Sequence, residues 1–126
     1  MILVDTNVII DLWKKPDKDK IEIFENEDMA TCGIIKAELI HGAKTDKEID
    51  LIIESLADFT FFEIKDNDWI EIGKILNLLK KNGITVPFQD AVLTFLSIKN
   101  NTFFWTYDNH FDLIKKEIPQ LKLFKH

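Results

Sequence analysis

The chain has 126 residues, 46% hydrophobic and 30% charged, a composition typical of a soluble globular protein with a core. Its net charge is −6 and all sixteen basic residues are lysine, which excludes bidentate arginine clamps on phosphate or guanine. The single cysteine, Cys32, excludes an intrachain disulfide, and no apolar run reaches the length of a membrane span. We therefore expect one cytoplasmic domain over residues 1–126, with no membrane segment.

The first predicted strand is followed directly by an acid. Residues 2–4 are apolar without alternation, as in a strand buried on both faces. Asp5 then lies at the carboxyl end of this strand, where open α/β sheets bind ligands. Thr6 or Asn7 can cap the next helix, which we expect to stop near Pro16. Asp5 is either a site residue or an acid that only closes a tight turn.

The middle of the chain predicts helices and strands in alternation. Hydrophobic spacing indicates helices over residues 17–26, 34–43, 46–58 and 66–81, and strands over residues 29–32 and 59–64. Glu38 lies beside an apolar stripe of the second of these helices. An acid near the core side of a helix is usually paired or bound to something. The alternative is a glutamate at the edge of the stripe that reaches solvent.

Two further acids lie at the ends of elements in the last third of the chain. Asp90 precedes residues 91–98, which are apolar nearly all round, as in a helix packed on a sheet. Asp108 follows a second buried strand, predicted over residues 102–107, and opens a helix that ends before Pro119; residues 121–124 form a last strand. Because aspartate is favoured at helix starts, both acids have the alternative interpretation of caps.

These four acids have a shared interpretation as a metal site. In a parallel sheet, Asp5, Glu38, Asp90 and Asp108 can converge on one edge. Clustered carboxylates repel one another and resist ionising together. Divalent cations remove this repulsion, and Mg²⁺ or Mn²⁺ prefers oxygen ligands. Two such ions can activate a water and stabilise both the attacking and leaving oxygens of a phosphodiester.

Four short segments in this order resemble those of a known family. They are Val4-Asp5-Thr6-Asn7-Val8-Ile9-Ile10, Ala37-Glu38-Leu39-Ile40-His41-Gly42, Asp90-Ala91 and Thr106-Tyr107-Asp108-Asn109-His110-Phe111. Together they span nearly the whole chain, and they resemble the PIN-domain ribonucleases. Their order and the chain length are most similar to the VapC-type toxins of bacterial and archaeal toxin–antitoxin pairs.

The resemblance implies both a fold and an activity. It implies a PIN-like αβα sandwich with a mostly parallel central sheet, and a metal-dependent endoribonuclease that cleaves RNA. Asp5, Glu38, Asp90 and Asp108 would hold Mg²⁺ or Mn²⁺, with Thr6 and Thr106 as hydroxyl supports and Asn7 shaping the first turn. It also implies a cognate antitoxin protein, bound at exposed apolar residues of the early helices such as Trp13. A homodimer is expected as well.

The sequence departs from the family pattern at two places. His110 stands where a second aspartate often precedes the phenylalanine of the last motif. Phe88 and Gln89 replace an acid often found shortly before the third motif. The sequence therefore leaves open whether the site binds one metal ion or two. We interpret His110 as lying at the surface or behind the metal ligands, in preference to a general base, and we assign no role to His41.

Other functions have less support from the residues. A haloacid-dehalogenase-like phosphatase also places an aspartate after its first strand, but it needs a second aspartate where this chain has Asn7. A Rossmann nucleotide-binding domain would need glycines that are missing. A non-catalytic PIN-like module that binds RNA or a partner becomes the better interpretation if the four carboxylates do not converge. Transfer, ribosomal and messenger RNA all remain open as substrates.

Overall fold

The computed structural model describes residues 1–126, and its strands form one sheet in which every pair is parallel. The strands are β1 (Ile2–Val4), β2 (Met29–Cys32), β3 (Thr60–Phe62), β4 (Phe103–Trp105) and β5 (Lys122–Leu123). Their order across the sheet is β3-β2-β1-β4-β5. This arrangement confirms the predicted α/β sandwich, and the sheet is wholly rather than mostly parallel.

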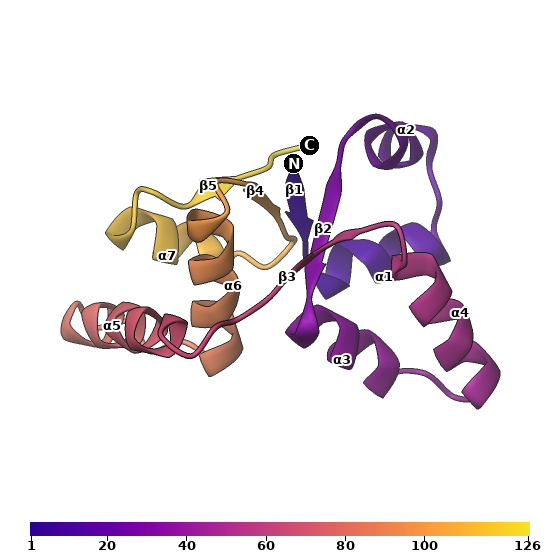
Figure 1. Cartoon of the computed structure of the whole chain (residues 1–126). Coiled ribbons are helices and arrows are strands. Elements are labelled where there is room, and N and C mark those ends of the chain that lie inside the picture. The colour runs from indigo at the N-terminus through magenta and orange to yellow at the C-terminus, as the bar shows by residue number, and fades with distance from the viewer.

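Helices cover both faces of the sheet (Figure 1). On one side lie α1 (Thr6–Lys14), α2 (Lys18–Asn26), α3 (Gly33–His41) and α4 (Asp46–Leu56); on the other lie α5 (Asp68–Lys81), α6 (Phe88–Lys99) and α7 (His110–Glu117). The chain runs outward from β1 to β3 and then returns to β4 on the other side of β1. The strand order thus reverses between β1 and β4, and such switch points are where open α/β sheets bind ligands. No helix is long and apolar enough to cross a membrane.

The core consists of the central strands and the helix that packs across them. All three residues of β1 are buried, and so are the eight consecutive residues 90–97 of α6. This confirms the prediction that α6 is enclosed nearly all round. Phe104 of β4 meets Phe111 of α7 edge to face, with ring centroids 4.7 Å apart. The switch point is therefore built on the most completely buried part of the chain.

Two helix starts differ from the expectation. The N-cap of α1 is Asp5, whose carboxylate accepts a hydrogen bond from the amide of Thr6 at 2.8 Å, so the predicted capping by Thr6 or Asn7 is wrong. Asp90 is not a cap either. The helix α6 begins at Phe88 with Pro87 as its N-cap residue, and Asp90 lies within the first turn.

Two neighbouring phenylalanines of β4 test this account of the core. Phe104 is 0% exposed, whereas Phe103 is 43% exposed. We expect Phe104→Ala to lower the free energy of unfolding by about 3–5 kcal/mol, because it leaves a cavity at the aromatic contact. Phe103→Ala is the matched control and should cost at most about 1 kcal/mol. Urea denaturation measures both values, and equal losses would contradict the assignment of the core.

Candidate active site

All four predicted acids line one cavity at the carboxyl edge of the sheet. Asp5 follows β1, Asp108 follows β4, Glu38 projects from α3 and Asp90 from the first turn of α6. The cavity has a volume of about 430 Å³. Its wall is completed by Thr6, Asn7, Ile10, Pro87, Gln89, Leu93 and His110. The structure therefore brings together four acids that lie up to about a hundred residues apart in sequence.

Hydrogen bonds hold the Asp5 carboxylate in one orientation. Its Oδ1 accepts from the backbone amide of Thr6 at 2.8 Å. Its Oδ2 accepts from the Thr106 hydroxyl at 2.7 Å and, more weakly, from the Asn7 side-chain amide at 3.4 Å. These contacts favour the ionised carboxylate, whereas burial acts against it more strongly and raises the pKa of Asp5 above its ordinary value, with a further small rise from the charge of Asp108.

Asn7 and Thr106 join the turns after β1 and β4. The Asn7 carboxamide donates to the Thr106 hydroxyl at 3.4 Å and accepts from the Tyr107 amide at 3.2 Å. The Thr106 hydroxyl accepts from the Asp108 amide at 3.0 Å. A continuous network thus connects Asp5 with Asp108. It fits the supporting positions expected of Thr106 and Asn7. Because the Asn7 side chain is a carboxamide, it cannot act as the second acid that a phosphatase of the haloacid dehalogenase type requires.

Thr6 contributes differently from the expectation. Its backbone amide reaches Asp5, whereas its hydroxyl is buried without a hydrogen-bond partner. The predicted hydroxyl support therefore has no contact with a carboxylate.

Burial and neighbouring charges raise the pKa of two further carboxylates, those of Glu38 and Asp90. Burial raises the pKa of Glu38, and the charge of Asp5 raises it further. For Asp90, burial is again the main cause, followed by the charges of Asp108 and Asp5, and the pKa rises to about 6. Asp90 is 8% exposed and its Oδ2 has no hydrogen-bond partner. Each of these effects would be relieved by a bound cation.

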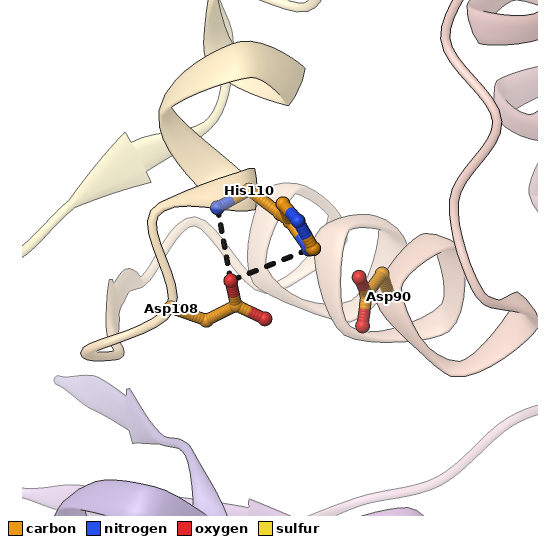
Figure 2. A group of neighbouring side chains, drawn as sticks. All are labelled: Asp90, Asp108 and His110. Carbon is orange, nitrogen blue, oxygen red and sulfur yellow. Dashed lines mark hydrogen bonds and ion pairs between the residues drawn. The ribbon is translucent and has the colours of Figure 1, made fainter.

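The donor set fits a divalent metal ion. Asp90, Asp108 and His110 each place one ligand atom within 4.8 Å of the others (Figure 2). Carboxylate oxygens dominate, as Mg²⁺ and Mn²⁺ prefer. The His110 side chain is 67% exposed, in line with the surface position interpreted from the sequence, and one of its ring nitrogens also lies within reach of these two carboxylates. The signal for it was its position two residues after Asp108, but a sequence cannot show which way an imidazole ring points.

The match to known proteins agrees with this geometry. The PIN domain family model matches residues 2–117. Ribonuclease VapC1 of Methanocaldococcus jannaschii is 30% identical over 116 residues, which cover 91% of this chain and 82% of the relative. Among solved structures, VapBC-1 from nontypeable Haemophilus influenzae is similar with a TM-score of 0.81, 24% identity and coverage of 99% and 98% of the two chains. VapBC-5 from Mycobacterium tuberculosis, a member of the VapBC family of toxin–antitoxin systems, has a TM-score of 0.72, 19% identity and coverage of 98% and 97%.

The raised pKa of Asp90 predicts how stability depends on pH in the absence of metal. The folded protein retains a proton on Asp90 up to about pH 6, whereas the unfolded chain releases it near 3.8. The free energy of unfolding should therefore fall as the pH rises through this window and stay low above it. In chelator, we expect Asp90→Asn to be more stable than the wild type at neutral pH, by at most about 3 kcal/mol.

The two proteins should converge near pH 4, where Asp90 is protonated in the folded wild type. Melting temperatures across this range make the comparison, with Asp112→Asn as a control for the loss of an exposed acid. A difference between Asp90→Asn and wild type that does not change with pH would show that Asp90 is not protonated in the folded state.

Proposed function

The chain belongs to the PIN-domain family, and from this premise we propose that it is a metal-dependent endoribonuclease, the toxin of a type II toxin–antitoxin system. The observation that carries the proposal is the convergence of four acids in one cavity at the switch point of the sheet. The ribonuclease activity of its 30% identical relative supports it. We further propose that residues 1–126 form a single PIN-like domain, acting in the cytoplasm.

Mg²⁺ or Mn²⁺ is the cofactor that the donor set favours. We assign Asp5, Glu38, Asp90 and Asp108 as its ligands and catalytic residues, because all four line the cavity. Such an ion, when bound, acidifies water and neutralises charge on phosphate oxygens. No lysine lines the cavity, so the negative charge of these acids would repel an RNA backbone unless a cation offset it.

The protein residues supply orientation and a defined shape. Thr106, Asn7 and the Thr6 amide hold Asp5 before any ligand arrives, so little ordering is left for the moment of binding. Asp90 lines the cavity from α6, and its buried Oδ2 has no hydrogen-bond partner. Ile10 and Leu93 form an apolar part of the wall, which limits water around the acids. A non-catalytic module would have no need for acids held under such repulsion.

A groove elsewhere on the surface is the proposed antitoxin site. It has a volume of about 740 Å³ and lies between α1, α3 and α4. Trp13 is 43% exposed and Leu51 is 52% exposed along it, so both offer apolar area to a partner. An amphipathic helix of the antitoxin fits such a groove, because apolar anchors spaced along one helix face can fill it. The similarity to VapBC-1 and VapBC-5 supports this partner.

We also propose that the protein forms a homodimer. A separate exposed aromatic pair, Trp69 of α5 and Phe88 of α6, stacks with centroids 6.0 Å apart. Ile70, beside it, is 61% exposed. Contiguous apolar surface of this kind marks an interface more often than free surface. Sedimentation velocity at micromolar concentration measures the oligomeric state directly.

Cleavage of a structured RNA tests the activity. Purified protein with Mg²⁺ or Mn²⁺ should cleave it, and chelator should stop the reaction. Asp5→Asn should reduce the rate by about 100-fold or more, because it removes a proposed metal ligand and leaves its hydrogen-bond donors unmatched. Asp112→Asn, which removes an exposed carboxyl on α7, is the matched control and should cleave like wild type. Activity that survives both chelator and Asp5→Asn would refute the proposal.

Affinity for the antitoxin tests the groove. We take the product of the adjacent gene as the antitoxin and measure its binding by calorimetry. Trp13→Ala should weaken the complex by about 30-fold or more, because buried tryptophans are frequent anchors of such interfaces. Leu113→Ala removes a similarly exposed apolar side chain from α7, outside the groove, and should leave the affinity unchanged. Equal effects of the two variants would exclude the groove as the binding site.

A further inference from the structure

His110 is the residue at which this site departs from an all-carboxylate metal centre. It opens α7, two residues after Asp108, and it lines the same cavity as the four acids. In Figure 2 its imidazole ring extends from the start of α7 towards the space between Asp108 and Asp90. One ligand atom from each of these three residues lies within 4.8 Å of the other two.

The separations of these three donor atoms are close to those of ligands that share one ion. Two atoms bound to one ion at about 2.1 Å lie about 3.0 Å apart when adjacent and about 4.2 Å apart when opposite in an octahedral shell. The His110 Nδ1 is 3.4 Å from Asp108 Oδ1, within this range. The widest separation in the group, up to 4.8 Å, needs a movement of only a few tenths of an ångström. The imidazole, whose side chain is 67% exposed, is free to make it.

A backbone hydrogen bond fixes the position from which the His110 side chain extends. The His110 amide donates to Asp108 Oδ1 at 2.9 Å, which fixes the start of α7 against that carboxylate. This hydrogen bond uses one lone pair of Oδ1 and leaves the other lone pairs of the Asp108 carboxylate available to a cation. A small movement of the side chain therefore brings His110 to an ion, without moving the helix.

Asp90 provides an independent sign that something binds there. It is 8% exposed and its Oδ2 has no hydrogen-bond partner. A buried carboxylate oxygen without a partner is costly, and a cation is the simplest group that satisfies it. An exposed ion pair between His110 and Asp108 would be worth little and would leave Asp90 as it is.

We propose that His110 is a nitrogen ligand of a cation bound between Asp90 and Asp108, and that it makes this position selective for a first-row transition dication over Mg²⁺. This inference rests on the proposed metal-dependent function. Imidazole nitrogen suits transition metals, whereas Mg²⁺ binds almost wholly through oxygen. The departure at residue 110 is then a change of metal preference rather than the loss of a ligand.

Cobalt is the probe for this ligand, because Co²⁺ bound to imidazole shifts the ring N–H proton far outside the normal NMR range. We expect Co²⁺-loaded wild-type protein, without RNA, to show one such resonance. His110→Asn should abolish it and weaken Co²⁺ binding by at least about 10-fold, measured by calorimetry. His126→Asn is the matched control, because it removes an exposed imidazole at the C-terminus, where it contacts Trp105, and should change neither result.

His110→Asp separates selectivity from simple loss of a ligand. It restores an oxygen donor, so Mg²⁺ should bind more tightly and the preference for Co²⁺ over Mg²⁺ should fall by at least about 10-fold. A shifted resonance that persists in His110→Asn, or equal Co²⁺ affinity in that variant and wild type, would overturn the inference. Circular dichroism confirms that each variant is folded. A normal cobalt spectrum without RNA cleavage would instead refute the proposed function and leave His110 as a ligand.

Discussion

The pairing of β1 with β4 is the constraint on which the site depends. The two strands are parallel and in register, with Val4 opposite Trp105. The ladder continues one residue further, because the Asp5 amide donates to the Trp105 carbonyl at 2.9 Å. Asp5 and Thr106 are thereby set side by side and their side chains meet at 2.7 Å. All of β1 is buried, as are Phe104 and Trp105 of β4, so the carboxyl end of neither strand can shift without disturbing the core.

The strands and helices around this pairing hold carboxylates close enough to repel one another, and a bound cation would relieve that repulsion. The four acids come from four separate elements, and the pKa of Asp90 is raised first by its burial and then by the charges of the other three. The packing of the surrounding core offsets the electrostatic cost of holding these carboxylates close together. A cation then gains affinity from two sources, the attraction of each carboxylate and the removal of repulsion among them. Rigidity in the scaffold is what converts an unfavourable arrangement into a binding site.

Much of this organisation could be predicted from the residues. Strands such as β1 and β4 can be predicted because a strand covered by helices on both faces is a continuous apolar run. An acid that directly follows such a run lies at the carboxyl edge of the sheet. The start of α6 could not be predicted. The helix begins at Phe88, so Asp90 lies in its first turn instead of at the cap, and Asp90 Oδ2 has no hydrogen-bond partner. The Asp5 carboxylate likewise took the capping role assigned to its neighbours. The place of His110 depends on how α6 and α7 face each other, a relation between distant segments that no local pattern contains.

The long separation between β1 and β4 has a consequence for the order of synthesis. The Thr106 and Asp5 side chains are 101 positions apart, so their contact closes a loop of most of the chain and costs conformational entropy. A ribosome releases the first acid early, but the strand that orients it emerges only after most of the chain has been made. A growing or prematurely terminated polypeptide therefore carries Asp5, Glu38 and Asp90 without the strand that gathers them. Only a nearly complete chain can assemble the four acids, because Asp108 and the strand before it are among the last parts to be made.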